Sequence, residues 1–273
     1  MIRSLWIAKS GLDTQQTNLD VITNNLSNNQ TIAFKKVRPI FSDLLYQTLR
    51  SPTSTGSTNI PVGLEVGGGS RVAASQRINT PGSLNVSQNP LDVALSNIGY
   101  MQVRVSPVGV TPPVIGYTRS GNLQTAIDPG RAGNVILTNS EGYPVLDLTG
   151  NPISIAQDYS QLVIGQDGAV TYTRGVPPVT TTAGTIAHVL FANPSGLASG
   201  GGGLYYETSA SGAPSVGTPN VGGRASIVQY YTELSNVNVA EELVGLIAAQ
   251  RAYEITTRAV SASDQLLQKL GQL

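Results

Sequence analysis

Leucine recurs at every seventh position near the start of the chain. Between Ser4 and about Asn28 there is no proline and one glycine, and the leucine row comprises Leu5, Leu12, Leu19 and Leu26. Three positions further on, a second row fades from apolar to polar and holds Ile22 as its one large apolar side chain. This heptad pattern predicts a helix of about 25 residues, roughly 37 Å long. We expect Asn28 or Asn29 to end it in a left-handed conformation.

A second long helix is predicted at the other end of the chain, from Asn238 to Leu270. Asn238 stands three residues before Glu241, which is the spacing of a capping box, and no proline follows. Glu254 and Arg258 are one turn apart in the order that favours an ion pair. The apolar stripe of this helix comprises Val239, Leu243, Leu246, Tyr253, Val260 and Leu267.

Short apolar runs between the two helices are separated by turn-forming pairs. Asp167-Gly168, with apolar runs on both sides, predicts a β-hairpin. We expect an antiparallel all-β domain here, so the fold class is α+β, with long N- and C-terminal helices packed as a coiled-coil-like stalk. The predicted divisions of the chain are residues 1–33, 34–70, 71–225 and 226–273.

Two segments beside the predicted β domain, residues 47–70 and 196–224, are rich in glycine and have no clear periodicity. Such lengths are long for passive connections, so we expect either mobile loops or segments that a partner orders. The two end helices, with their interrupted apolar stripes, form only a marginal stalk, because helical stability comes mainly from packing. Association with further copies would bury those stripes.

Charge and composition narrow the classes of partner. Sixteen basic residues balance sixteen acidic ones without any block of like charge, which disfavours nucleic acid and anionic membranes as partners. No apolar run approaches the 18 residues that span a bilayer. The apolar patch before Lys9 is too short for a secretory signal, so we expect a soluble protein without a cleaved leader.

Candidate catalytic chemistry is sparse. His188 is the only histidine and there is no cysteine, so neither a zinc site nor a Cys–His pair can be built, and a serine triad would have to use His188. The glycine runs lack the lysine and hydroxyl residue of a phosphate-binding loop. We predict no catalytic, cofactor-binding or metal residues and no enzyme activity. The rival hypotheses are an enzyme acting on cell-wall sugars and a secreted carbohydrate-binding protein.

Two long terminal motifs carry a resemblance. "SGLDTQQTNLDVITNNLSNNQTIAFKK" and "ELSNVNVAEELVGLIAAQRAYEITTRAVSASDQLLQKL" resemble the paired end signatures of the bacterial flagellar rod and hook axial proteins. The motif residues are Asn24, Asn25, Asn28, Thr31, Phe34, Lys35, Ser235, Asn236, Asn238 and Glu241. The asparagines either form a helix end and turn or bond to neighbouring subunits. Ala33 stands where the family usually has glycine, and a positive φ there would strain it.

The resemblance implies a structural role. The segment "FSDLLYQTLRSP" is similar to the one that distinguishes the distal-rod members of the family, with Tyr46, Gln47, Arg50 and Pro52 as stiffening residues. It implies a helical homopolymer whose terminal helices form an inner tube around an export channel, with residues 34–70 joining neighbours. The implied partners are proximal rod proteins, the hook protein, the surrounding rings and the flagellar type III export apparatus, and the implied location is the basal body. A proximal rod or hook subunit is the nearest alternative.

Overall fold

The computed structural model describes residues 2–55, 58–60, 62–105 and 114–270, and the chain forms two compact units. Unit 1 consists of Met1–Ser27, Val37–Arg77 and Asn238–Leu273. Unit 2 consists of Asn28–Lys36 and Ile78–Val237. These bounds differ from the predicted divisions at residues 33, 70 and 225, because short segments near both predicted helices bond to the strands of unit 2. The central antiparallel strands between two terminal helices confirm the α+β class.

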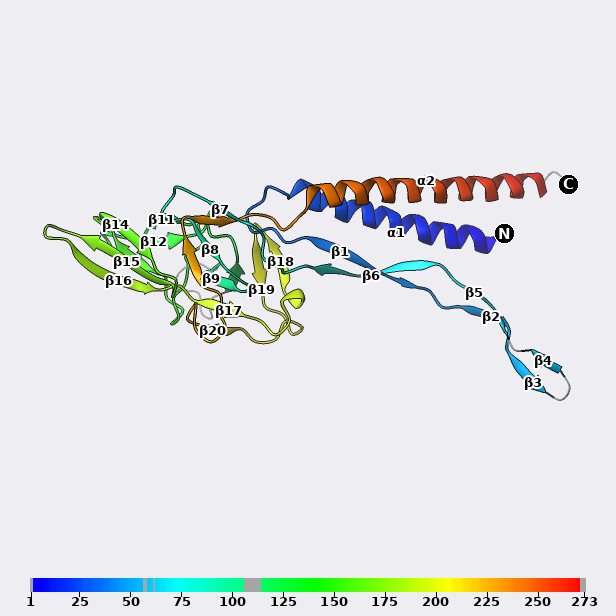
Figure 1. Ribbon diagram of the computed structural model, residues 1–273, viewed down its shortest axis with the longest axis horizontal. Helices are drawn as coiled ribbons and strands as arrows, with labels where there is room; N and C mark the ends of the chain where they lie inside the picture. Colours follow the sequence, from blue (N-terminus) through cyan, green and yellow to red (C-terminus); the bar gives the residue numbers. More distant parts are fainter. Residues whose placement is uncertain (1, 56–57, 61, 106–113, 271–273) are drawn as a thin grey trace. The chain divides into compact units, whose positions relative to one another are not determined.

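Unit 1 contains both helices, α1 (Ile2–Ser27) and α2 (Val239–Leu270), lying side by side in Figure 1. They run antiparallel, since Gly11 faces Thr256 and Gly245 faces Ile22. Asn238 caps α2 as predicted, and its Oδ1 accepts hydrogen bonds from the amides of Ala240 (3.1 Å) and Glu241 (3.5 Å). Neither helix has an apolar stretch long enough to cross a membrane within the described residues.

The end of α1 lies close to the predicted position, but the prediction that a left-handed asparagine ends it is wrong. The non-glycine residues with positive φ in the described chain are Ala33, Asn220 and Tyr230, so neither Asn28 nor Asn29 is left-handed. Instead α1 stops at Ser27 and a turn follows, in which the amide of Thr31 donates to the carbonyl of Asn28.

The remaining part of unit 1 is a chain of two-stranded ribbons, visible below the helices in Figure 1. The strand pairs are β1 (Val37–Asp43) with β6 (Ser70–Arg77), β2 (Gln47–Arg50) with β5 (Leu64–Val66), and β3 (Thr53–Thr55) with β4 (Thr58–Ile60). The described parts of the Ser/Thr/Gly-rich segment therefore contain short strands that pair within the single chain. Ser10 Oγ on α1 accepts a hydrogen bond from the amide of Ser70, which ties β6 to the helix.

Unit 2 is built from short antiparallel strands and one 3-10 helix, η1 (Pro194–Gly196). The strands are β7 (Leu84–Val86), β8 (Val93–Leu95), β9 (Tyr100–Arg104), β10 (Ile115–Thr118), β11 (Gln124–Ile127), β12 (Asn134–Thr138), β13 (Ser154–Ala156), β14 (Gln161–Ile164), β15 (Ala169–Arg174), β16 (Val179–Thr185), β17 (His188–Leu190), β18 (Ala198–Gly201), β19 (Leu204–Tyr206), β20 (Ser215–Gly217), β21 (Ile227–Gln229) and β22 (Tyr231–Glu233).

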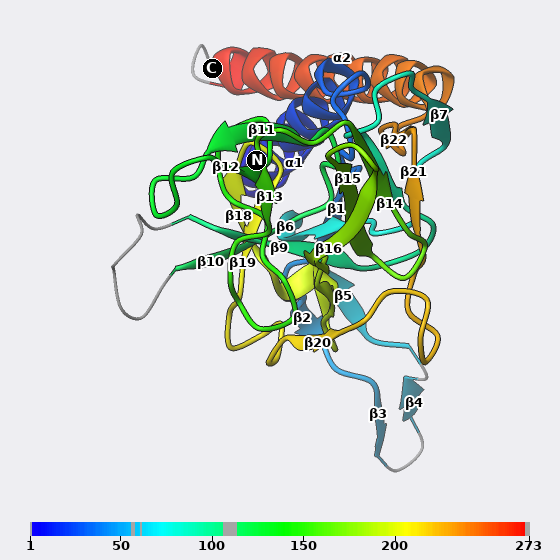
Figure 2. The same cartoon turned by 90° about the vertical axis from the view of Figure 1, so that its left-hand side faces the viewer.

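The strands of unit 2 pair into several small sheets, and Figure 2 shows them from the end. The largest has the order β18-β19-β10-β9-β17-β20, and two three-stranded sheets are β11-β12-β13 and β14-β15-β16. The hairpin β14–β15 turns at Asp167-Gly168 as predicted, with Gly168 at φ +78° and the Asp167 carboxylate accepting from the amide of Ala169. Glycine allows this φ without strain.

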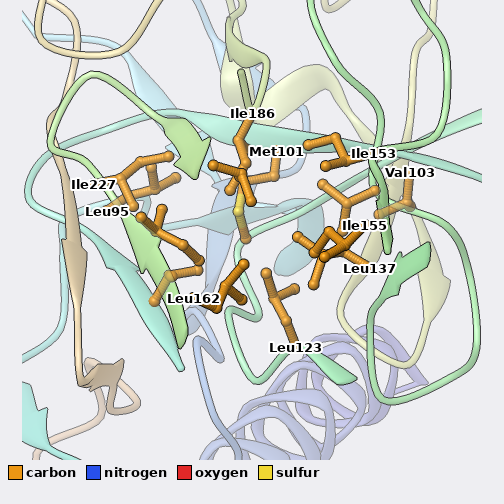
Figure 3. Close-up of a cluster of buried hydrophobic side chains, with 14 of the residues drawn as sticks. Leu95, Met101, Val103, Leu123, Leu137, Ile153, Ile155, Leu162, Ile186 and Ile227 are labelled. Carbon is orange, nitrogen blue, oxygen red and sulfur yellow. The ribbon is translucent and has the colours of Figure 1, made fainter. Parts of the chain in front are cut away.

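The main core of unit 2 lies where these sheets meet, and Figure 3 shows its aliphatic side chains converging. Strand β9 is buried on both faces. Successive side chains point to opposite faces of a strand, so they enter two different clusters. Met101 and Val103 enter the main core, whereas Tyr100 joins a smaller aromatic cluster with Phe191 and Tyr205. The ring centroids of Tyr100 and Tyr205 are 5.5 Å apart in an edge-to-face arrangement.

Candidate functional site

The helix pair of unit 1 buries little of its apolar surface. Ile22 and Ala249 are the hydrophobic residues of this unit that are fully buried within the described chain. Most of the predicted stripe is only half-buried, namely Leu5, Leu12, Leu19, Leu26, Leu246 and Val260. Three further stripe residues are exposed: Val239, Leu243 and Tyr253. The side chain of Leu267 lies outside the described residues.

Several large apolar side chains on the helices point into solvent. Trp6 on α1 is 65% exposed, and on α2 Val244 and Ile255 are 68% and 67% exposed. A groove of about 520 Å³ runs between the two helices. It is lined by Leu5, Trp6, Lys9, Leu12, Asp13, Gln16, Tyr253 and Val260. Exposed large apolar side chains beside an apolar groove are typical of a protein interface.

Asn25 clamps the end of α1 inside unit 1. It is buried, and its side-chain amide bonds both backbone groups of Val37: Nδ2 donates to the carbonyl (2.8 Å) and Oδ1 accepts from the amide (3.0 Å). Nδ2 also donates to Oε2 of the buried Glu242 on α2 at 3.2 Å. Asn25 therefore bonds to Val37 and Glu242 within the chain, a role that differs from both the helix-end and the subunit-bonding hypotheses for the asparagines. Asn24 is exposed, and Asn28 accepts a hydrogen bond from the hydroxyl of Thr31 at 3.1 Å.

A buried charged cluster in unit 2 joins the two terminal motifs. Lys35 and Glu233 are 1% exposed and Arg119 is 2% exposed. The Lys35 ammonium donates to Glu233 Oε1 at 2.5 Å and to the carbonyl of Thr80 at 2.9 Å. Arg119 Nε donates to Glu233 Oε2 at 3.0 Å, and its Nη1 donates to the carbonyls of Asn97 and Gly99. We call Lys35, Arg119 and Glu233 the buried triad.

The buried triad holds two cations against one carboxylate. Burial lowers the pKa of Lys35 below its usual 10.5, the positive charge of Arg119 lowers it further, and Glu233 opposes both effects. Removing one partner of such a group leaves an uncompensated buried charge. Glu233 is therefore the one carboxylate of the triad, and both cations form their ion pair with it.

Backbone contacts fasten the same two segments together. The amide of Ala33 donates to the carbonyl of Glu233 at 2.8 Å, and Asn236 Oδ1 accepts from the amide of Lys36 at 2.7 Å. The carbonyl of Phe34 accepts from the amide of Asn236, while Ser235 accepts from the amide of Val237. Ala33 is buried with φ 57°, so the predicted strain of an alanine at this position is present.

The stiffening residues lie on or beside the exposed ribbon β2. Tyr46, Gln47, Arg50 and Pro52 are all exposed, and the neighbouring Leu45 is 93% exposed. The ring of Tyr46 lies against Gly67, where a Cβ would sit 3.5 Å from its Cε1 atom. The ribbon thus presents side chains on its surface without forming a core of its own.

His188 is the first residue of β17 and is buried inside unit 2. Burial and the nearby charges of Arg224 and Arg119 lower its pKa from 6.5 to about 4, although the backbone of Ile98 opposes part of the shift. Neither ring nitrogen has a hydrogen-bond partner of normal geometry in the described residues. With no group of three or more metal-ligating side chains in that part of the chain, His188 is a core residue.

Sequence reasoning missed the roles of Arg119, Glu233 and Glu242. Glu233 begins the quoted C-terminal motif, but no periodicity separates it from other acidic residues. Arg119 stands in a polar stretch between strands, and its partner is 114 positions away. Only the presence of Glu233 in one motif and Lys35 in the other could have suggested a link.

Known protein families match this chain in both terminal regions and in part of unit 2. Three family models fit: Flagella basal body rod protein over residues 5–35, Flagellar hook protein FlgE/F/G D1 domain over 94–172, and Flagellar basal body rod FlgEFG protein C-terminal over 228–273. The flagellar basal-body rod protein FlgG of Buchnera aphidicola subsp. Acyrthosiphon pisum is 42% identical over 275 residues, covering 100% of both chains. The chain belongs to the flagellar rod and hook protein family.

Other flagellar basal-body rod proteins named FlgG show the same full-length similarity. That of Caulobacter vibrioides is 37% identical and covers 100% of this chain and 99% of its own length. That of Bacillus subtilis is 32% identical, with the same coverage of the two chains. The buried triad takes one residue from each of the three matched regions of this flagellar rod and hook family, Lys35, Arg119 and Glu233. It therefore joins the parts that the family models describe separately.

Proposed function

We propose that this protein is the structural subunit of the distal part of the bacterial flagellar rod, and that it polymerises helically into a rigid tube. One observation carries the proposal: unit 1 leaves most of its apolar helix surface uncovered, with Trp6, Val244 and Ile255 about two-thirds exposed. The names of the full-length relatives support the placement in the rod. A surface that a single copy cannot bury is expected to be covered by further copies.

In the assembled rod, the terminal helices form a coiled-coil-like inner tube around the export channel. A head-to-tail contact that does not close on itself produces a helical filament, and each added copy covers the apolar helix faces of the last. Packing between neighbouring copies would supply the knobs-into-holes contacts that two half-exposed helices lack alone. Transmission of torque then depends on many small contacts and needs no reactive group.

The joining segment, residues 34–70, is the proposed stiffening element, with Tyr46, Gln47, Arg50 and Pro52 as its stiffening residues. Its apolar side chains, among them Leu45, Tyr46 and Leu49, are exposed in the single chain and would become buried between neighbours. Removing residues 47–66 should give a polymer that is more flexible or curved, as measured by persistence length in electron micrographs. A polymer of unchanged stiffness would exclude this role.

The other parts of the proposal follow from the rod assignment. The subunit acts without catalysis, reaches the basal body unfolded through the flagellar type III apparatus, and contacts proximal rod proteins, the hook protein and the surrounding rings. A proximal rod or hook subunit would use the same helices, and the ribbon favours the distal position.

The test is assembly of the full-length chain after a change on the helix surface. Leu243→Asp should abolish sedimentation of polymer, since a carboxylate then faces the apolar surface of the next copy, whereas Leu243→Met keeps the apolar volume and should assemble. Circular dichroism should show the same folded unit 2 in both variants. Sedimentation of Leu243→Asp at the wild-type level would overturn the proposed function.

A further inference from the structure

The outer side of α2 carries a stripe of exposed apolar and charged residues. We define the α2 ridge as Val244, Ile247, Arg251, Glu254 and Ile255. All five are exposed. At 3.6 residues per turn Ile247, Arg251 and Glu254 lie on the opposite side of α2 from the residues that face α1, which include Gly245 and Thr256. Ile255, at the edge of the ridge, also borders a second groove that α1 lines with Ile7 and Gly11. A single copy therefore cannot place its ridge in its own groove.

The groove between α1 and α2 has the complementary character. Its floor is apolar, formed by Leu5, Trp6, Leu12, Tyr253 and Val260, and its α1 rim carries Lys9 and Asp13. The Lys9 ammonium lies 5.5 Å from the centre of the Trp6 ring. An apolar floor of this size, beside an exposed tryptophan, suits the branched aliphatic side chains of the ridge.

The charges on the two surfaces are arranged in opposite order. Lys9 and Asp13 are four residues apart on α1, and on α2 Arg251 and Glu254 are three residues apart. Within the described residues none of these four side chains forms an ion pair in its own chain, and the expected pair of Glu254 with Arg258 is also not formed. Apart from the contact of Lys9 with the Trp6 ring, these charged groups are therefore available to a second copy.

Resting on the proposed assembly, we infer that the α2 ridge of one copy seats in the α1–α2 groove of the next, with Lys9 facing Glu254 and Asp13 facing Arg251. This pairing requires the two helices to run antiparallel, as α1 and α2 do within one copy. Copies that share one polarity along a filament meet that requirement. The partner is thus a second copy of this chain, bound through two different surfaces, and the contact does not close on itself.

The pairing also specifies a register. Within one copy Gly11 faces Thr256, whereas between copies Asp13 would face Arg251. This differs from the register within one copy by three to four residues, or roughly 5 Å at the rise of an α-helix. Neighbouring copies in contact through this interface would be displaced by that amount along the helix axis.

Cross-linking tests the contact directly, because the chain has no cysteine. Two full-length single-cysteine variants, Asp13→Cys and Arg251→Cys, are mixed under assembly conditions and oxidised, and disulfide-linked dimer is measured on a non-reducing gel. We expect at least ten-fold more dimer than from the matched control mixture of Asp13→Cys with Arg258→Cys, whose second position lies two turns away. Equal cross-linking in both mixtures, or more in the control, would overturn the inferred register.

Charge reversal gives an independent test. Lys9→Glu or Glu254→Lys alone should slow assembly several-fold at low salt, and the double variant, in which every copy carries both changes, should recover the wild-type rate. The emission of Trp6, the only tryptophan, should shift to the blue as polymer forms. If the wild type assembles with that shift but the double variant shows no recovery, this contact is wrong and the proposed function stands. If the wild type neither sediments nor shifts its emission, both fall.

Discussion

The two units of this protein differ in how much of their apolar surface they bury. Among the buried hydrophobic residues that the structure describes, only Ile22 and Ala249 belong to unit 1, whereas unit 2 has a main core and a separate aromatic cluster. Unit 2 can thus be stable as a single copy, since burial of apolar surface dominates folding. Unit 1 leaves its core incomplete, and its stability is expected to depend on the concentration of the subunit.

The largest expected effect comes from the buried triad. Glu233→Gln should destabilise unit 2 by about 3–5 kcal/mol, because Lys35 and Arg119 then remain buried without a counter-charge. Chemical denaturation of the monomer measures this. The control is Glu241→Gln, an exposed change in the first turn of α2 that should alter the free energy of unfolding by less than about 0.5 kcal/mol. A loss under about 1 kcal/mol for Glu233→Gln would show that the triad does not hold unit 2 together.

The next largest effect is expected from a change in the core of unit 2, which should distinguish the stability of the two units. Changing the fully buried Leu137 to alanine should lower the free energy of unfolding by about 2–5 kcal/mol. The same change at the exposed Leu243 in unit 1 should leave monomer stability nearly unaltered while reducing assembly. If Leu243→Ala destabilised the monomer as much as Leu137→Ala, unit 1 would have a core of its own and the contrast would fail.

Acid should weaken unit 2 through His188. Its pKa is lowered to about 4 in the folded state, so the unfolded chain binds the proton more readily between that value and 6.5. This contribution to stability is complete above pH 6.5 and is lost as the pH falls toward 4. Thermal unfolding across this range should show a steeper decline for the wild type than for His188→Leu, which cannot titrate. Parallel pH profiles would exclude His188 as the cause.

The smallest expected effect is a gain in the stability of unit 2. Ala33→Gly should stabilise unit 2 by about 1 kcal/mol, because glycine adopts the observed φ of 57° without the penalty that a Cβ imposes. The measurement is the denaturation midpoint of the monomer. Ala74→Gly on β6, where the backbone is extended, serves as the opposite control and should destabilise. Equal effects at both sites would mean that backbone strain at Ala33 is unimportant.

Local patterns predicted the regular parts of this fold well. The leucine repeat placed α1 within two residues of its observed ends, and the Asn238 cap placed the start of α2. The ribbon of residues 37–77 was missed as structure, because strands such as β2 and β5 are exposed on both faces and show no alternation. The buried triad could not be predicted, since its partners are 114 and 198 positions apart and a polar residue carries no signal of burial.

The position of Glu233 along the chain also bears on the timing of folding. Synthesis delivers the N-terminal residues first, so Lys35 and Arg119 exist as two like charges before the carboxylate that pairs with both has been made. Strand β22, which ends at Glu233, is the last strand of unit 2. We therefore expect the buried triad to be completed only when nearly all of the chain is present. For a subunit that travels to its site unfolded, as proposed above, late completion of the triad favours a chain that is still unfolded during export over one that has become compact too early.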